Sequence, residues 1–438
     1  MLSNKEINKL AIPAILFNIT EPLIGLVDTA IIGQIDQNAT LAQGGVGLSA
    51  GLFATLIWGF AQMRTSLSAI ISRNYGSNAL HKVKSLIPQT IILTASLGVI
   101  MSLLLSYYFK DVTFFLFGEM DPLTFKFSMD YFIVRSYGLP IGLTIALFFG
   151  VFRGFQNTSW AMYISLIGGT TNIVLDYIFV LGWDPFIEPL GVKGAAWAAV
   201  IAQIVMLVLC VIFYLNNTPF NLKLSKKISP FFKEMIGIFI NMFLRTMVLN
   251  LVFIISNRFA NGYGSSSLAA YTIAYNIWIF TSFFIDGYAN AGNALAGKFL
   301  GEKNNEKLKV LGNKLLFTNI KIAVILMLAY SLVYFKIGHI FNDNPEVITL
   351  FETTFWIVII AQPFNAIAFT FDGIFKGLGR AKDLRNTLIA ATFIVFIPTI
   401  YLFDFLTQGL HCIWIALSLW MIYRGGSLLY KFKGIVNG

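Results

Sequence analysis

Two aspartates lie inside stretches of this chain that otherwise read as membrane-spanning helices. Asp28 stands in LIGLVDTAIIG and Asp176 in NIVLDYIFVLG, and neither has a cation beside it in the sequence. A carboxylate in hydrocarbon is costly, so such a residue normally faces the protein interior or a water-filled path, where it binds an ion or a proton. The two aspartates therefore predict a carrier in which one proton, shared by two carboxyl groups, loads and leaves.

The first apolar stretch carries further polar residues and two prolines. Asn18, Glu21 and Asp28 are separated by steps that place them along one helical face. Pro13 and Pro22 lie in the same stretch, and proline removes an intrahelical hydrogen bond and favours a kink. We expect this helix to bend, and we expect Glu21 and Asn18 to contribute to the cation site or to be structural.

The fifth apolar stretch places an amide beside the second aspartate. Asn172 precedes Asp176 by four residues, so both lie on one helical face. Gly168 and Gly169 come just before them and have no side chains, so a neighbouring helix can approach closely there. If this face meets Asp28, a polar pocket results that could hold a proton or, through Asp28, Asn172 and Asp176, a sodium ion. The alternative is that both aspartates are structural and only hydrogen-bonded.

The elements that position these residues are predicted to be transmembrane helices. The 438 residues are 57% hydrophobic and only 12% charged, whereas a soluble domain carries about 25% charged residues. About twelve apolar runs come near the roughly 20 residues that span a bilayer as a helix. Their extents are Leu10 to Ile35, Gly44 to Ile71, Ser85 to Phe109, Met129 to Phe152, Ala161 to Trp183, Gly194 to Leu215, Glu234 to Phe259, Ser266 to Ala296, Asn313 to Phe335, Val347 to Gly373, Asn386 to Phe405 and Gly409 to Tyr430.

The net charge of +10 comes from cationic residues that gather in the loops on one side of the predicted membrane protein. Most of the 31 Lys and Arg residues fall in loops on the side that also holds both termini. The positive-inside rule then places both termini in the cytoplasm of a multi-pass protein, with a bacterial inner (plasma) membrane as the expected location. Anionic lipid is the expected contact of this charge, and nucleic acid is not. The polar tail from Met1 to Lys9 leads into a run without a cleavage site, so we expect the first helix to be retained.

Signals for catalysis and for cofactors are missing from the sequence. Cys210 and Cys412 both lie in apolar runs, and the three histidines are scattered, which gives no disulfide framework and no metal-ligand cluster. Motifs of hydrolases, zinc proteases and ATP-binding loops are also missing. We therefore expect no enzyme and no cofactor, with H⁺ or Na⁺ as the coupling ion and a monomer as the working unit.

An internal repeat organises the chain. AIISRNYGSNALHKVKSLI from Ala69 resembles ALAGKFLGEKNNEKLKVLG from Ala294, which places Gly76 over Gly301, and a second block places Pro140 over Pro363. We predict an all-α membrane protein of twelve helices in two six-helix lobes, related by a pseudo-two-fold axis along the membrane normal. The lobes are residues 1–215 and 234–438, and 216–233 form a cytoplasmic linker. Projected through the repeat, Asp28 falls near Phe253 and Asp176 near Thr399, so the acids are specific to the first lobe.

Several motifs together resemble the DinF-like branch of the MATE (multidrug and toxic compound extrusion) transporters. The resemblance covers nearly the whole chain and its motifs occur in order. They are Phe17-Asn18-Ile19-Thr20-Glu21-Pro22 with Gly25-Leu26-Val27-Asp28-Thr29-Ala30, Tyr131-Phe132 with Arg135, Gly138 and Pro140, then Asn172-Ile173-Val174-Leu175-Asp176, Asp286-Gly287-Tyr288-Ala289 and Asp372-Gly373-Ile374-Phe375.

The resemblance implies a two-lobe exporter of organic cations and other amphipathic compounds in exchange for protons or sodium ions. In that family the residues that match Asp28, Asp176, Asn172 and Tyr131 form a cation or proton site in the first lobe. The residue that matches Pro13 marks the bending of the first helix. The family usually has a glutamate in the eighth helix where this chain has Asn293. The seventh helix of this chain also lacks the buried glutamate of the sodium-coupled NorM-like branch. We therefore expect no second-lobe sodium site of the usual type, and a proton rather than sodium as the coupling ion.

Other intramembrane charges are secondary candidates. Arg135 could pair with a carboxylate, and for Arg245 a structural ion pair is as reasonable as a transport role. Asp286 and Asp372 each precede a glycine within an apolar run, and both roles stay open for them. Two other functions remain as alternatives: a lipid-linked oligosaccharide flippase, which would line its cleft with arginines, and a membrane-embedded transferase, which would need clustered His or Asp motifs.

Overall fold

The computed structural model describes residues 2–35 and 38–437, most of which are helical. Within these residues, eleven helices are long and apolar enough to cross a membrane, or up to twelve when a bent pair is taken as one span. Each of the twelve apolar runs found in the sequence corresponds to one of them. The prediction of an all-α membrane protein is therefore confirmed.

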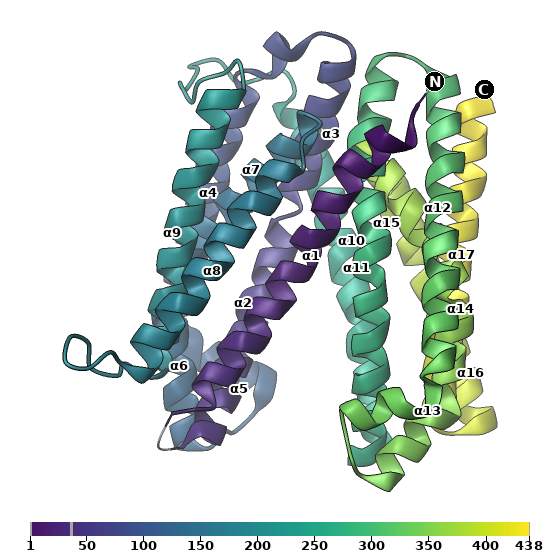
Figure 1. Cartoon of the computed structure of the whole chain (residues 1–438). Coiled ribbons are helices and arrows are strands. Elements are labelled where there is room, and N and C mark those ends of the chain that lie inside the picture. Colours follow the sequence, from purple (N-terminus) through teal and green to yellow (C-terminus); the bar gives the residue numbers. More distant parts are fainter. Residues whose placement is uncertain (1, 36–37, 438) are drawn as a thin grey trace. The chain divides into compact units, whose positions relative to one another are not determined.

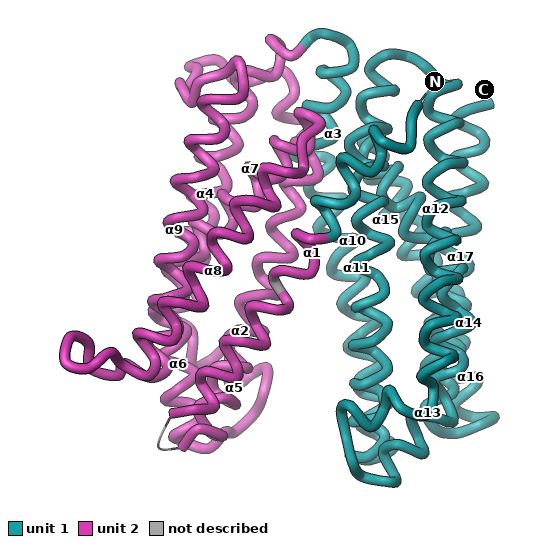
Figure 2. The backbone as a smooth tube through the Cα atoms, in the orientation of Figure 1, with its two compact units in different colours: residues 1–15, 68–79, 236–438 teal, residues 16–67, 80–235 magenta. Residues whose placement is uncertain are grey.

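The chain forms two compact units (Figures 1 and 2). Unit 1 comprises Met1–Ile15, Ser68–Ala79 and Ile236–Gly438, and unit 2 comprises Leu16–Leu67 and Leu80–Met235. The division passes through three helices, α1 (Asn4–Ile32), α3 (Met63–Gly76) and the first turn of α10 (Phe232–Gly262). Unit 2 otherwise contains α2 (Ala39–Phe60), the 3-10 turn η1 (Leu80–Val83), α4 (Leu86–Tyr107), α5 (Phe109–Phe117), α6 (Pro122–Ser136), α7 (Gly138–Gly154), α8 (Ser159–Leu181) and α9 (Val192–Asn217). Unit 1 contains most of α10 (Phe232–Gly262), and α11 (Ser265–Gly301), α12 (Asn305–Leu332), α13 (Tyr334–Ile337), η2 (Gly338–Ile340), α14 (Pro345–Gly377), α15 (Ala381–Ala390), the π-helical η3 (Ala391–Phe396), α16 (Ile397–Thr407) and α17 (Leu410–Asn437).

The fourth predicted span is broken into two helices. α6 and α7 meet at Tyr137 with an angle of 52° between them. Pro140 lies in the first turn of α7, where its missing N–H cannot bond back to α6, and its ring disfavours helical geometry at Leu139. The sequence predicted one continuous helix here, and the proline explains why the structure has a bend.

In unit 2 the ends of α1, α2, α6, α8 and α9 share one apolar core. Ile32, Ala42, Val134, Val180 and Ala196 are all buried in it. Small residues bring the helices close, because a Cβ on Gly45 of α2 would lie 2.7 Å from the Thr124 carbonyl oxygen of α6. This core fixes the helices that carry the polar residues considered below.

In unit 1, repeat-related residues at the ends of α3 and α11 contact each other reciprocally. A Cβ on Gly76 would lie 1.9 Å from the Lys298 carbonyl oxygen, and a Cβ on Gly301 would lie 1.9 Å from the Arg73 carbonyl oxygen. The sequence repeat places Gly76 over Gly301 and Arg73 over Lys298. The glycine of each repeat therefore contacts the cationic residue of the other repeat. Such a reciprocal contact is typical of a local two-fold relation.

The close approach predicts a sharp cost for any side chain at these glycines. Replacing Gly76 by alanine is expected to lower the unfolding free energy by about 1 to 3 kcal/mol, because the added methyl group meets backbone atoms that cannot rotate away. Thermal unfolding of the purified protein in detergent measures the change. Gly434→Ala in α17 is the matched control, because nothing lies within 4 Å of its Cβ position. If both variants unfold at the same temperature as the parent, the close packing of α3 against α11 is contradicted.

Candidate functional site

Asp28 and Asp176 lie together in unit 2, bridged by one amide. The Nδ2 group of Asn172 donates hydrogen bonds to Asp28 Oδ1 at 3.2 Å and to Asp176 Oδ2 at 2.5 Å. Asp176 is 1% exposed and Asn172 is 8% exposed, whereas Asp28 is partly buried. α1 and α8 therefore place two carboxyl groups against one donor.

The acid pair contains one buried carboxyl oxygen that lacks a donor among the described residues. The two carboxyl groups share one donor, Asn172 Nδ2, which holds both of them close to the same amide group. Among the described residues, no N–H or O–H group donates to the buried Oδ1 atom of Asp176. Buried polar atoms are nearly always paired, so this oxygen is the expected place for a proton or a monovalent cation.

Two glycines in α8 explain why the pair meets. A Cβ on Gly168 would lie 2.3 Å from the Met206 side chain of α9, and a Cβ on Gly169 would lie 2.5 Å from Ile24 of α1. The glycines therefore allow α8 to pack closely on both neighbours. Asn172 and Asp176 follow within two turns, close to the α1 surface.

α6 supplies a tyrosine and an arginine to the same cluster. Tyr131 is 7% exposed, and Arg135 follows it one turn along α6. Both side chains interact electrostatically with Asp28 and Asp176. The structure thus brings four predicted residues, together with Arg135, into one polar cluster made by α1, α6 and α8.

The other first-helix candidates are less closely defined. Asn18 is partly buried in α1, and the side chain of Glu21 lies outside the described part of the structure. Pro13 and Pro22 both lie within α1, which is helical from Asn4 to Ile32. Pro13 belongs to the part of α1 in unit 1, and Pro22 to the part in unit 2.

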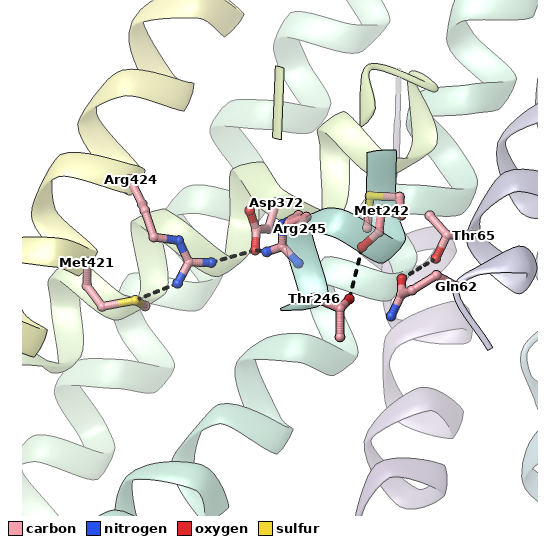
Figure 3. A network of polar contacts seen from close by, with 8 residues as sticks. All are labelled: Gln62, Thr65, Met242, Arg245, Thr246, Asp372, Met421 and Arg424. Carbon is pink, nitrogen blue, oxygen red and sulfur yellow. Dashed lines mark hydrogen bonds and ion pairs between the residues drawn. The ribbon is translucent and has the colours of Figure 1, made fainter. Parts of the chain in front are cut away.

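Asp372 belongs to a separate, fully buried ion cluster in unit 1 (Figure 3). Its Oδ2 atom accepts hydrogen bonds from Arg245 of α10 and, at 2.8 Å, from Nη2 of Arg424 of α17. The Arg424 guanidinium also lies 4.3 Å from the Trp420 ring centroid. Asp372, Arg245 and Arg424 are 4%, 6% and 3% exposed. Of the two roles left open for Arg245, the structural ion pair is the one that this geometry shows.

Asp286, the remaining candidate, also lies in unit 1. It is partly buried in α11 and accepts a hydrogen bond from Asn290 Nδ2 at 2.9 Å. Among the described residues, no group of three or more His, Cys, Asp or Glu side chains is placed to hold a metal ion.

Two polar partners were missed by sequence reasoning. Gln203 of α9 accepts a hydrogen bond from Arg135 Nη1 at 2.9 Å, and Arg424 pairs with Asp372. The sequence did carry a signal for Gln203, because it is a lone amide residue within an apolar run. Arg424 lies near the end of the last predicted span, and α17 continues well past it to Asn437, which places it in the helix interior.

Comparison with known proteins agrees with this architecture. The MatE family model matches residues 13–178 and 242–402, which is most of the chain. The chain is 26% identical to Protein DETOXIFICATION 42 of Arabidopsis thaliana, with 96% of this chain and 90% of the relative covered. It is 25% identical to DNA damage-inducible protein F of Escherichia coli, with 97% and 91% covered.

A solved structure has the same fold. An outward-facing multidrug resistance MATE family transporter of the MOP superfamily matches with a TM-score of 0.89 and 20% identity. The match covers 99% of this chain and 96% of that chain. At this identity the likeness establishes the fold.

Proposed function

Because this chain belongs to the MATE family of transporters, we propose that it is a cation-coupled antiporter that exports organic cations or amphipathic drugs, with the proton as its coupling ion. Proteins of this family are multi-pass membrane transporters, not enzymes, and they use ion gradients rather than cofactors. The observation that carries the proposal is the buried pair of Asp28 and Asp176 bridged by Asn172. Detoxification and multidrug resistance appear in the names of similar proteins, which supports drugs as substrates.

The proposed cycle depends on neutralising the acid pair. When both carboxyl groups are ionised, their repulsion favours an arrangement that a cationic substrate or a coupling cation can stabilise. A proton that enters from outside removes this repulsion, and the polar network around Asp28 rearranges with α1, which contains Pro13 and Pro22. In the alternating-access scheme the bound substrate then leaves outward.

The available driving force suffices for export by this cycle. The membrane potential contributes about 2.3 kcal/mol per charge per 100 mV. A tenfold concentration ratio requires about 1.4 kcal/mol. For an uncharged amphipathic substrate, one proton per cycle therefore supports a gradient of the order of tens to a hundredfold. The exchange of one proton for one monovalent organic cation moves no net charge, so it is driven by the pH difference alone.

Location and assembly form part of the same proposal. Lys223, Lys226 and Lys227 lie in the segment between the two halves of the chain, and the positive-inside rule favours a cytoplasmic position for this segment. Both termini would lie on that side of a bacterial inner membrane. The proposed working unit is a monomer.

The proposal is tested by transport into or out of proteoliposomes. A fluorescent organic cation is followed in vesicles on which a pH gradient and a sodium gradient are imposed separately. We expect export that follows the pH gradient and persists without sodium. Export that follows only the sodium gradient would contradict the choice of ion, and movement that follows neither would contradict coupled antiport.

A further inference from the structure

The first helix is buried at its two ends and loosely packed between them. At its C-terminal end Ile31 and Ile32 are buried in the core of unit 2. From Ile15 to Ala30 no side chain that the structure describes is buried. α1 therefore joins two anchored ends that belong to different units, and Figure 2 shows the change of unit within it. The buried side chains at its N-terminal end belong to unit 1 and are Leu2, Ile7, Leu10, Ala11 and Ala14.

α11 offers this N-terminal end a closely fitting surface. A Cβ on Gly287 would lie 3.1 Å from the Ala11 carbonyl oxygen and would overlap the Ile15 side chain. Next to this glycine, the Tyr288 hydroxyl donates a hydrogen bond to Asn8 Oδ1 at 3.1 Å. Two residues of a motif that the sequence analysis singled out thus bind α1.

Two lysines fasten the start of α1 at separate points. Lys298 of α11 forms an ion pair with Glu6 at 3.4 Å. Nζ of Lys314 on α12 donates to the Leu2 carbonyl oxygen at 2.7 Å and to Asn4 Oδ1 at 3.3 Å. Each contact is at least partly exposed and weak alone, but together they hold this end of the helix at three places. We call residues 2–14 and these contacts the N-terminal anchor.

The same helix reaches the acid pair near its other end. Asp28 lies one turn before the buried Ile32 and accepts a hydrogen bond from Asn172 of α8. A helix is a rigid element that carries a displacement at one end to the other. Since the stretch between the ends buries no described side chain, little packing opposes its movement. A rearrangement at Asp28 therefore reaches unit 1 through the N-terminal anchor.

We propose that the N-terminal anchor makes α1 the coupling element of the antiport, with Tyr288, Lys298 and Lys314 as positioning residues. This inference rests on the proposed antiport and adds how the cation site acts on unit 1. While the anchor holds, unit 1 follows each movement of α1 that accompanies loading or release of the coupling ion. When the anchor is loosened, α1 moves alone, and the ion passes without export of substrate.

The test combines Tyr288→Phe, Lys298→Met and Lys314→Met in one variant. These changes keep the side-chain volumes nearly constant and remove the polar contacts of α11 and α12 with α1. Proton flux and flux of a fluorescent organic cation are measured in the same proteoliposomes. The number of protons moved per substrate molecule is expected to rise about fivefold or more, the lower end of the usual coupling between two sites. Substrate binding in detergent should match the parent, because the acid pair is unchanged.

The matched control removes two cations of unit 1 that do not contact α1. Lys307 pairs with Glu302 at 2.8 Å, and Lys309 Nζ donates to Asn437 Oδ1 at 3.2 Å. The double variant Lys307→Met, Lys309→Met is expected to keep the parent's ratio of protons to substrate.

Two results would overturn the inference. If the triple variant transports more slowly but at the parent's ratio, the anchor only stabilises the fold. Should the triple variant fail to fold, Tyr288→Phe alone decides, because it removes a single hydroxyl group: a ratio above the parent's supports the inference, and the parent's ratio contradicts it. A parent whose export moves no protons would instead contradict the proposed antiport, and this inference with it.

Discussion

Replacing Asp176 by asparagine reduces pH-driven export by roughly 100-fold or more on the proposed scheme, a loss equivalent to about 2.7 kcal/mol. Asparagine has nearly the shape of a protonated aspartic acid, so the bridge from Asn172 can reorganise with little change of volume. It cannot bind and release a proton. The variant should therefore stay folded while the coupling step is lost. Initial rates in proteoliposomes with a fixed pH gradient measure the effect.

A matched control lies on a neighbouring helix of the same unit. Asp130 is partly buried and forms an ion pair at 3.3 Å with the exposed Lys193, and ion pairs near the surface contribute only about 0 to 1 kcal/mol. Asp130→Asn is expected to export at nearly the parent's rate. If Asp176→Asn and Asp130→Asn export equally well, the carboxyl group of Asp176 has no coupling role.

The second large effect concerns stability. Replacing Asp372 by asparagine leaves Arg245 and Arg424 buried without their common counter-charge. Breaking a buried ion cluster by removal of one partner costs about 3 to 5 kcal/mol. We expect Asp372→Asn to unfold at a clearly lower temperature than the parent, measured on purified protein in detergent.

Asp383 provides the comparison for that experiment. It pairs with Arg380 and Lys431, but its side chain is 33% exposed. Solvent screens this pair, so Asp383→Asn is expected to change the unfolding free energy by less than about 1 kcal/mol. An Asp372→Asn protein as stable as Asp383→Asn would mean that water or another acid compensates the two arginines.

The helical frame could be predicted from the sequence because apolar length and charge placement are strong signals in membrane proteins. The twelve runs were each found, and the main departure is the bend at Tyr137. Pro140 was visible in the sequence, yet a proline alone does not say whether a helix kinks slightly or breaks. The close approach of Gly138 to the Arg135 and Gln203 side chains belongs to the tertiary structure, so the sequence could not show it.

The candidate site was only partly predictable. Asp28, Asn172 and Asp176 stand out as polar residues in apolar helices, and their spacing predicts the faces on which they lie. That α1 and α8 would meet at these faces depends on the packing of Gly168 and Gly169, which helical periodicity does not fix. Arg424 was hidden by its position near a predicted helix end, and its pairing with Asp372 joins residues that are distant in the sequence.

Proton release on substrate binding is the measurement that addresses the central claim most directly. An organic cation is added to the purified protein in lightly buffered solution near neutral pH, and the change in pH is recorded for the parent and for the double variant Asp28→Asn, Asp176→Asn. The account predicts that the parent releases protons in step with substrate binding and that the double variant releases none. Equal release by both proteins would show that the exchanged proton is held elsewhere.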